Sequence, residues 1–362
     1  MSYFHLNLIL KGKLTVCCLL MLSVIPLNAQ REAKQIGDFK ESISLNEHLR
    51  GTKRTLQYCP DGDEFVCVNG KNRYTRALYG SHSPFRVDTS DRPVFAFYNN
   101  GRGGNISFKV ILRDGTELAL DRTGYCESRY SAGKRTYYLT DPSWGKGELR
   151  ISVLALADMD GAIWRFSPSN MPKGAILRWQ HGGATGKRLS RNGDMGVDPA
   201  DCFELPAEAT DLVTGELALQ KEVYLVRGEV PEGYNVRKLY QQAEAASLAL
   251  ASHLKIETPD PYLNTLGGAL VAAADGIWDG QVWLHGAIGW RMPLSGWRAG
   301  YTGDALGWHD RARTHFDAYA ASQVTDVPNT IPHPAQDSTM NLARSEKRWG
   351  TPQYSNGYIC RN

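Results

Sequence analysis

Apolar and polar residues alternate along short segments from about Leu56 to Arg227. These segments are rich in Val, Ile, Phe, Tyr and Thr, and Gly, Asp, Asn and Pro separate them, which is typical of half-buried strands joined by turns. The clearest segments are FVCVNG, RPVFAFYNN, NISFKVILRDG, TELALDRTG, RTYYLTD, ELRISVLALADMDG and AIWRFSP. No segment of helical period interrupts them. We therefore predict an antiparallel β-sandwich domain over residues 56–232.

Helical periodicity begins abruptly after this block. From Val236 to Lys255, apolar residues recur at steps of three and four, and Asn235 precedes them as a candidate N-cap. We predict a linker helix within residues 233–256. Two prolines end this helix and begin a second helical segment, YLNTLGGALVAAADGIW.

A third helix is predicted from Gly303 to about Ser322, with Thr302 as its cap. Its apolar stripe comprises Ala305, Trp308, Ala312, Phe316 and Tyr319. The tail that follows, residues 327–362, is rich in Pro, Asn, Ser and Thr and has no strong periodicity. The chain is therefore predicted to place its strands first and its helices afterwards, in separate blocks.

The first 29 residues have the pattern of a secretory signal peptide. Lys11 and Lys13 precede the apolar run LTVCCLLMLSVIPL, and the small residue Ala29 stands before a polar segment. Because the run is short for a transmembrane helix, we expect cleavage after Ala29 and export to the periplasm or cell surface. An uncleaved anchor is one alternative. A lipoprotein is another, although the residue before the first cysteine of the run is a large valine.

Charge gives little support for a nucleic acid partner. Removal of the signal with its two lysines lowers the formal net charge from +3 to +1, and no basic tract remains. Cleavage would also leave no membrane anchor. Residues 30–55 are polar and are expected to form a leader before the sandwich.

Five cysteines remain after the signal, and their odd number excludes complete pairing within one chain. Cys59 and Cys67 are the nearest candidates for a disulfide in an exported protein. We expect mostly buried free thiols with at most one or two disulfides, because the cysteine spacings do not fit a zinc site. The five are Cys59, Cys67, Cys126, Cys202 and Cys360.

Flat and charged side chains are concentrated near the predicted second and third helices. Five of the nine tryptophans fall within residues 278–308, and residues 289–313 have the sequence GWRMPLSGWRAGYTGDALGWHDRAR. Much of this block is expected to form the loop between the two helices. Aromatic rings with a few convergent polar groups are the composition of a ligand pocket, and sugars suit it, because their C–H faces stack on rings while their hydroxyls bind charged groups.

We therefore predict a saccharide-binding cleft in this block. If the sugar is acidic, the guanidinium of Arg291, Arg298 or Arg311 would pair with its carboxylate through a planar fork. The predicted substrate-binding residues are Trp283, His285, Trp290, Arg291, Trp297, Arg298, Tyr301, Trp308, His309 and Arg311.

A purely structural explanation competes with the cleft. Tryptophans pack protein cores, and arginine stacks on them as a structural cation–π pair. Asp304, in the first turn of the predicted third helix, would stabilise the helix dipole without any catalytic role. His309 and Asp310 would then form salt bridges with their neighbours.

Other motifs are weaker. Asp158 and Asp160 in ADMDG resemble the start of a calcium loop, but the later ligands are missing and a turn is favoured. His285 and His309 do not form a paired-histidine zinc motif. The sequence has neither a G-x-S-x-G elbow nor a P-loop, and GGATGK at residues 182–187 lacks the strand-to-helix setting of a phosphate loop. We therefore expect neither a metal nor a cofactor.

The layout of sandwich, linker helix and helical hairpins resembles that of six-hairpin glycosidases, whose catalytic domain is an (α/α)6 barrel. It is more similar to uncharacterised exported proteins of glycan-degrading Gram-negative bacteria, which join a β-sandwich domain of unknown function to a six-hairpin region. The resemblance covers roughly residues 40–362 and is strongest at PLSGWRAGYTGDALGW.

One motif can be compared by residue. The α-L-rhamnosidase-like six-hairpin enzymes have the pattern Cys-Pro-x-Arg-Glu-x-Arg-x-Gly-Trp-x-Gly-Asp-Ala. Tyr301 stands in place of its tryptophan, and Gly296 and Trp297 occupy its acidic positions, so the family's proton donor is absent from this segment. The resemblance implies that an acid would come from Asp279, Asp304 or Asp310. The matching positions are Pro293, Arg298, Gly300, Gly303, Asp304 and Ala305.

The resemblance implies a glycoside hydrolase-like protein that acts on or binds polysaccharide-derived sugars, with Asp304 or Asp310 as acid or base. Residues 257–362 are too few for twelve barrel helices, so we expect an incomplete six-hairpin domain and an N-terminal fragment of the full enzyme. Glycoside hydrolysis usually needs two carboxylates, and whether this chain is an enzyme stays open. The alternatives are a non-catalytic carbohydrate-binding or interaction protein, and a lyase or unsaturated-uronide hydrolase on the same toroid.

Overall fold

The structure is a computed structural model that describes residues 41–42, 54–55, 57–71, 76–83, 85–99, 102–188, 212–230, 232–284 and 293–321. The chain divides into two compact units, Met1–Leu56 and Gln57–Asn362. In the first unit, strands β1 (Glu41–Ser42) and β2 (Arg54–Thr55) pair antiparallel. This pair falls within the segment predicted as a leader. All elements named below belong to the second unit.

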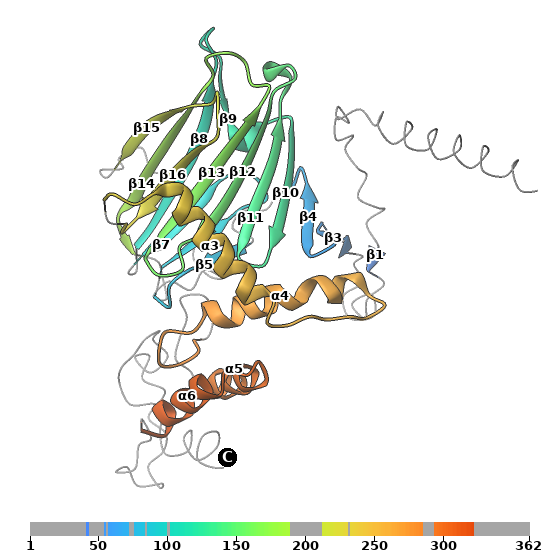
Figure 1. Cartoon of the computed structure of the whole chain (residues 1–362), viewed down its shortest axis with the longest axis vertical. Helices are drawn as coiled ribbons and strands as arrows, with labels where there is room; N and C mark the ends of the chain where they lie inside the picture. The colour runs from blue at the N-terminus through green and yellow to red at the C-terminus, as the bar shows by residue number, and fades with distance from the viewer. Residues whose placement is uncertain are drawn as a thin grey trace, which may run out of the picture. The chain divides into compact units, whose positions relative to one another are not determined.

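Two antiparallel sheets dominate the described part of the second unit (Figure 1). The first sheet has the order β16 (Val223–Gly228), β13 (Gly161–Ser169), β12 (Glu148–Ala155), β11 (Lys134–Thr140), β10 (Tyr125–Ser131), β4 (Glu64–Val68), β3 (Cys59–Asp61). The second has the order β15 (Val213–Ala218), β14 (Ile176–Arg188), β8 (Arg102–Ile111), β7 (Phe95–Asn99), β6 (Arg86–Thr89), β5 (Arg76–Tyr79), with β9 (Glu117–Ala119) paired to β8. Two short 3-10 helices, Leu120–Arg122 and Pro142–Trp144, lie in the connections.

The sheets share one apolar core. Phe95 of the second sheet packs edge-to-face against Trp164 of the first, with ring centroids 5.5 Å apart, and against Tyr137 at 5.7 Å. Phe108 and Phe166 join them at 5.1 Å across the same core. All five side chains are at most 2% exposed. The predicted antiparallel sandwich is therefore confirmed, because inward-facing residues of both sheets interdigitate as alternation requires.

The outer face of the first sheet is covered in part by a helix. Strand register places Leu154, Ile163 and Val226 in one row across β12, β13 and β16. Helix α3 (Val236–Ala251) packs on this apolar row through Leu239, Tyr240 and Ala243, which lie in the same buried cluster. The helix predicted after Asn235 and its cap are confirmed, since the Asn235 side chain accepts a hydrogen bond from the Lys238 N–H at 3.0 Å.

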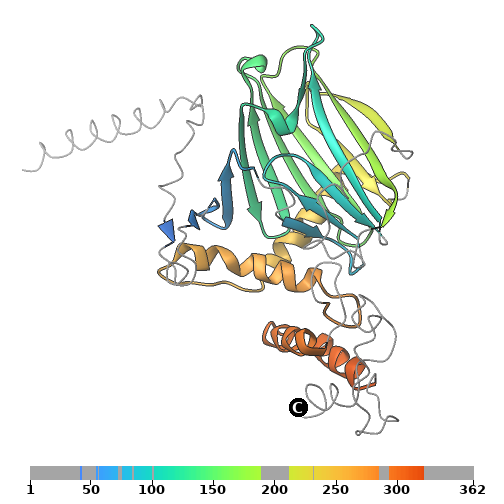
Figure 2. The ribbon, with the colours of Figure 1, turned by 180° about the vertical axis from the view of Figure 1, so that it is seen from behind.

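Helix α4 (Pro261–Gly276) closes one end of the sandwich, and both views show it along that end (Figure 2). Its N-cap is Asp260, which accepts a hydrogen bond from the Tyr262 N–H at 2.8 Å. Tyr262, Leu266 and Ala269 pack against the sandwich core. The Thr265 hydroxyl donates to the carbonyl of Gly62 at 2.9 Å. Helix α4 is therefore fixed to the sandwich by both apolar and polar contacts.

The prediction of a single third helix is wrong. The structure has α5 (Pro293–Ala305) and α6 (His309–Ala321), separated by a turn in which Gly307 has a φ of 81°. Residues other than glycine rarely adopt this left-handed conformation, which ends helices efficiently. Periodicity alone missed the break, because the apolar spacing continues across it. Much of the aromatic block predicted as loop is consequently helix.

The three described cysteines, Cys59, Cys67 and Cys126, are buried free thiols, as expected. Cys59 pairs with Val66 across the β3–β4 hairpin. Cys67 follows Val66 on β4, and successive side chains of a strand point to opposite faces. Cys59 and Cys67 therefore do not form the candidate disulfide. Burial raises the pKa of the Cys126 thiol to about 12, which keeps it protonated and unreactive. Cys202 and Cys360 lie outside the described residues. None of the described helices is both long and apolar enough to span a bilayer.

Candidate functional site

Trp283, which was predicted to bind substrate, is a residue of the protein core. Trp283 is 1% exposed, its Nε1–H donates to the carbonyl of Ala274 at 2.9 Å, and its backbone N–H donates to Nδ1 of the buried His315 at 3.0 Å. Its ring stacks on Trp308 at 6.4 Å and contacts Trp278 at 4.6 Å. The structural explanation therefore holds for Trp283, whose indole has no free face for a sugar.

The glycines of the resembling motif explain how this packing is possible. A Cβ on Gly303 would lie 2.1 Å from the Trp283 ring, and a Cβ on Gly300 would lie 2.7 Å from Phe316. Both glycines lie on α5, three residues apart and thus on one face. They let α5 approach α6 and Trp283 closely. Part of the motif therefore has a packing role.

The two predicted catalytic acids are on the surface. Asp304 is in the last turn of α5, not in the first turn of a helix, and its Oδ1 lies 2.6 Å from Nδ1 of His309. Their side chains are 58% and 69% exposed. Asp310 is in the first turn of α6, 95% exposed, with its Oδ1 3.7 Å from the guanidinium of Arg313. Neither acid lines the cavity described below.

The remaining predicted residues lie in different environments. Tyr301 on α5 is 44% exposed and contacts Phe316 at 5.7 Å, and Arg298 is also exposed. Trp308 is half-buried under Arg311. His285, Trp290 and Arg291 lie outside the described residues, as does the side chain of Trp297. Of the predicted residues that the structure describes, Arg311 is the one that lines the cavity.

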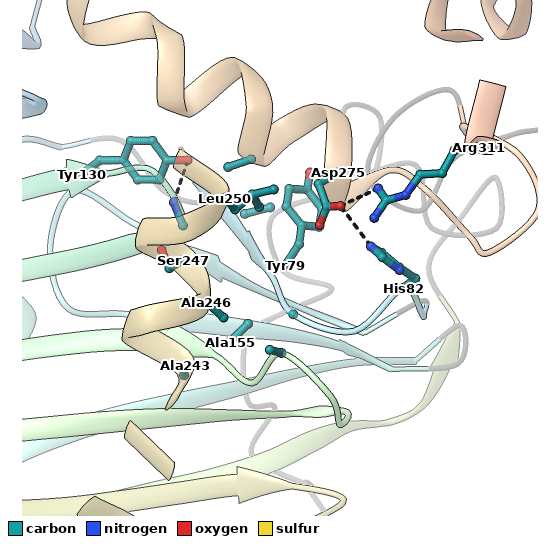
Figure 3. Close-up of a pocket in the computed structure, with 15 residues that line it drawn as sticks. Tyr79, His82, Tyr130, Ala155, Ala243, Ala246, Ser247, Leu250, Asp275 and Arg311 are labelled. Atoms are coloured by element: carbon teal, nitrogen blue, oxygen red, sulfur yellow. Dashed lines mark hydrogen bonds and ion pairs between the residues drawn. The ribbon is translucent and has the colours of Figure 1, made fainter. Parts of the chain in front are cut away.

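A cavity of about 240 Å³ lies where the sandwich meets the helices (Figure 3). Its walls come from β5, the loop after β5, the ends of β10 and β12, helices α3 and α4, and the start of α6. Small side chains form most of the wall, and they leave the space open. The described lining residues are Ala77, Tyr79, Gly80, His82, Tyr130, Gly133, Ala155, Ala157, Ala243, Ala246, Ser247, Leu250, Ala272, Asp275 and Arg311.

A carboxylate with two basic partners stands at one end of this cavity. Asp275, in the last turns of α4, accepts a hydrogen bond from Nη1 of Arg311 at 2.6 Å, and its Oδ1 is 3.1 Å from Nε2 of His82. The Asp275 side chain is 14% exposed. Burial opposes its ionisation, but hydrogen bonds from His82 and Arg311 outweigh burial and hold the pKa of Asp275 below its ordinary value. Asp275 is therefore a permanently charged acceptor near neutral pH.

The partners of Asp275 are themselves held in place. The guanidinium of Arg311 lies 4.7 Å from the Trp308 ring centroid and 5.9 Å from that of Trp278. This cation–π contact connects the tryptophan cluster to the cavity. His82 sits between Ser81 and Ser83, whose hydroxyls both donate to Oδ1 of Asp160, the first at 2.6 Å.

Asp160 belongs to the ADMDG segment that we considered as a calcium loop. In the structure it lies in the turn between β12 and β13, and its carboxylate anchors the loop that carries His82. The turn interpretation is therefore the better one. Within the part of the chain that the structure describes, no group of three or more metal-ligating side chains is arranged to hold a metal ion.

Two tyrosines complete the cavity. The Tyr79 ring packs so closely on α4 that a Cβ on Gly276 would lie 2.2 Å from it. Burial raises the pKa of Tyr79 and of Tyr130, so both phenols remain neutral donors. The Ser247 hydroxyl donates to the carbonyl of Ala132 at 2.5 Å, which fixes this part of α3 against the sandwich.

The sequence prediction missed His82 and Asp275. His82 is almost 200 residues away from Asp275, and no local pattern connects them. Asp275 follows three alanines in AAADG and has a weak signal: it is a charged residue on the apolar face of a predicted helix. The arrangement offers an ionised acceptor, a guanidinium, an imidazole and two aromatic rings around a space for a small polar ligand.

Comparison with known proteins gives limited information. A family model described as a domain of unknown function (DUF4450) matches residues 100–230. This range extends from β8 to β16, so it includes most of the sandwich and excludes helices α3 to α6. No curated protein matches the chain.

Among solved structures, the chain is similar to a bacterial glucoamylase solved in complex with acarbose. The sequence identity is 9% and the TM-score is 0.43. The match covers 71% of this chain and 53% of the glucoamylase chain, so this chain spans about half the length of that structure. The domain boundaries, the incomplete toroid and the secretory signal stay predictions.

Proposed function

We propose that this chain is a glycosidase-like protein that binds one saccharide unit in the cavity beside Asp275. The observation that supports this most is the ionised Asp275 at the end of a cavity of about 240 Å³, flanked by Arg311 and His82. A carboxylate accepts hydrogen bonds from vicinal hydroxyls, and the guanidinium and imidazole donate to ring or hydroxyl oxygens.

The size and wall of the cavity favour a sugar ring. The volume is below the roughly 300 to 1,000 Å³ of sites for drug-sized ligands, so it suits one ring and not an extended chain. Tyr79 and Tyr130 supply the flat apolar surface on which the C–H face of a pyranose stacks. A larger glycan would place its terminal unit here.

Binding is favoured over hydrolysis for the described residues. Glycoside hydrolysis usually uses two carboxyl groups, about 5 Å or about 6.5 to 9.5 Å apart, one of which has a raised pKa. Asp275 is the carboxylate among the described lining residues, and its pKa is lowered. It is therefore suited to anchor a ligand and poorly suited to donate a proton.

Hydrolysis is the second candidate, and the match of the α5 segment to the six-hairpin motif favours it. In this alternative, Asp304 or Asp310 would serve as acid or base in a longer enzyme of which this chain is the N-terminal part. A lyase or uronide hydrolase on the same toroid is a further alternative, in which Arg291, Arg298 or Arg311 would bind the carboxylate of an acidic sugar. Export to the periplasm or cell surface, where polysaccharide fragments are available, is part of the proposal.

A glycan array followed by calorimetric titration tests the proposal. We expect a neutral mono- or oligosaccharide to bind, and Asp275→Asn to weaken its binding by about tenfold or more, because a charged hydrogen bond contributes about 1.5 to 3 kcal/mol. Asp310→Asn is the matched control, since Asp310 is 95% exposed and does not itself line the cavity. Unchanged affinity in Asp275→Asn contradicts the cavity as the binding site.

Variants of the two predicted acids, Asp304→Asn and Asp310→Asn, separate binding from hydrolysis. If the chain releases reducing sugar from an array hit and Asp304→Asn or Asp310→Asn abolishes the release, hydrolysis is the function. If binding persists and no variant changes any turnover, the binding function stands.

A further inference from the structure

The outer face of the first sheet has a polar area beside α3. Strand register defines two rows on this face: Glu127, Tyr138, Arg150 and Ser167, and next to it Arg129, Thr136, Ser152, Arg165 and Tyr224. Figure 1 shows α3 crossing the lower part of this face and leaving the upper part of β11, β12 and β13 uncovered. None of the described residues that line the cavity belongs to either row.

Two arginines in this area have no acidic partner among the described residues. No hydrogen bond or ion pair joins the guanidinium of Arg150 or Arg165 to a described group, and the Nε–H of each is hidden from solvent without an acceptor. Glu148, two residues before Arg150 on β12, is exposed on the same face, and no ion pair joins it to either arginine. Two other acids on this side are engaged elsewhere. Glu127 accepts from Arg129 at 2.5 Å, and Glu222 accepts from Tyr224 at 2.6 Å and from Arg237 at 3.3 Å.

The two arginines are near neighbours on adjacent strands, and each guanidinium lies over an aromatic ring. Arg150 pairs with Ser167 and Ser152 with Arg165, so the arginines are diagonal neighbours on adjacent strands, about 7 to 8 Å apart at their backbones. Arg150 lies 5.4 Å from the Tyr138 ring centroid, and Arg165 lies 4.3 Å from that of Tyr240 on α3. Stacking fixes the planes of both guanidiniums and leaves their terminal N–H groups available as donors.

This arrangement is unusual for a surface with only a structural role. Like charges placed side by side repel each other, and a hidden N–H without an acceptor destabilises the fold. An anion that bridges the two guanidiniums would remove the repulsion and would accept forked hydrogen bonds from both.

We propose that Arg150 and Arg165, with Tyr138 and Tyr240, form a second binding site that recognises an acidic group on a saccharide. The saccharide part of this inference depends on the proposed function, whereas the recognition of an anion does not. Two guanidiniums suit one carboxylate or sulfate group. A nucleic acid would need a longer basic surface, and Arg129 and Lys134 nearby are already paired with Glu64 and Glu244.

Equilibrium titration with three short oligosaccharides tests this site: trigalacturonate, a sulfated heparin trisaccharide and neutral maltotriose. We expect one or both acidic probes to bind in low salt and more weakly in high salt. Arg150→Gln and Arg165→Gln should each weaken that binding by about tenfold or more. Binding of trigalacturonate would show that a carboxylate is sufficient, whereas binding of the heparin trisaccharide alone, which has both groups, would assign recognition to its sulfates.

Arg178→Gln is the matched control, because Arg178 lies on the second sheet and pairs with Glu216 and Glu117. It should leave the binding unchanged. If Arg150→Gln fails to fold, Arg150→Lys preserves the positive charge and loses the fork, and it should still weaken binding severalfold. The site is overturned if neither acidic probe binds, if maltotriose competes equally, or if Arg178→Gln has the same effect as the two tested variants.

Neutral and acidic ligands separate this inference from the proposed function. Loss of acidic binding in the Arg150 and Arg165 variants, with Asp275→Asn unaffected, supports the second site even when no neutral sugar binds the cavity. Loss of acidic binding in Asp275→Asn alone assigns the acidic sugar to the cavity and contradicts the second site.

Discussion

Single residues at the candidate site have roles that their neighbours determine. Asp275 is charged in spite of its burial, because Arg311 and His82 both approach its Oδ1 atom. Asp304 and Asp310, which the sequence suggested as acids, have exposed side chains and lie outside the cavity. The sequence shows where the three aspartates are but not how each is surrounded. The environment of Asp275 depends on a loop almost 200 residues away in sequence, which no local pattern reveals.

The charge on Asp275 makes stability depend on pH. Its pKa is lower in the folded state than its ordinary value of 3.8, so the native state binds fewer protons than the unfolded state in the acidic range. Its contribution is therefore fully present above the unfolded pKa and is lost as the pH falls through the folded pKa. Asp275→Asn should lower the free energy of unfolding by about 1 to 3 kcal/mol at about pH 7.

Denaturant unfolding at about pH 7 and about pH 3 measures this effect. The difference between wild type and Asp275→Asn should shrink at the lower pH, while Asp310→Asn should show little difference at either. A difference that stays constant or grows toward acid would show that Asp275 is not held as a carboxylate by its partners.

At the level of elements, alternation and helical periodicity predicted most of the fold. The sandwich and the helix after Asn235 follow from local spacing, because each element buries one face. The break between α5 and α6 was missed, since the apolar spacing runs through Gly307 and only its left-handed backbone ends the helix. Strands β5 and β6 were not singled out in this strand-rich region, since RALY and RVDT are short and Arg86 of RVDT is a charged residue that tertiary contacts bury.

The N-cap of α3 should be measurable by itself. Asn235→Ala removes the side-chain oxygen that accepts the Lys238 N–H, and should lower the free energy of unfolding by about 1 kcal/mol. Gln241→Ala, at an exposed position of the same helix, should change it far less. Equal effects of the two substitutions in chemical denaturation would contradict the assigned cap.

Packing of α5 depends on the absence of a side chain at Gly303. In Gly303→Ala, the new Cβ would meet the buried indole of Trp283 at 2.1 Å, and the resulting overpacking should destabilise the helical part by about 1 to 3 kcal/mol. Tryptophan fluorescence should report the shift at Trp283. Thr302→Ala, one residue away and exposed, is the control, and a stable Gly303→Ala with unchanged fluorescence would refute this contact.

For the whole molecule, the order of strands before helices was predictable from the sequence, whereas the cavity at their junction was not. The cavity exists because α3, α4 and α6 meet the ends of β5, β10 and β12, and this meeting depends on tertiary packing. The predicted saccharide cleft and the observed cavity share Arg311 as a lining residue. The tryptophans near it act largely through packing, with Trp308 and Trp278 positioning the guanidinium of Arg311.

Export is a property of the whole chain that can be checked directly. We predict that the protein secreted from a Gram-negative host begins at Gln30, because the small residue Ala29 precedes a polar segment after the apolar run. Mass spectrometry of the N-terminal peptide in a periplasmic fraction measures this. A retained Met1 terminus in a membrane fraction would instead indicate an uncleaved anchor.

The most direct test of the central claim is to block the cavity without touching its charges. Ala246 is an exposed residue of α3 that lines the cavity, and its neighbour Ala245 is exposed but does not line it. Calorimetric titration with the neutral sugar found on the array should show binding lost in Ala246→Trp and retained in Ala245→Trp. Equal affinities of the two variants would contradict saccharide binding in this cavity.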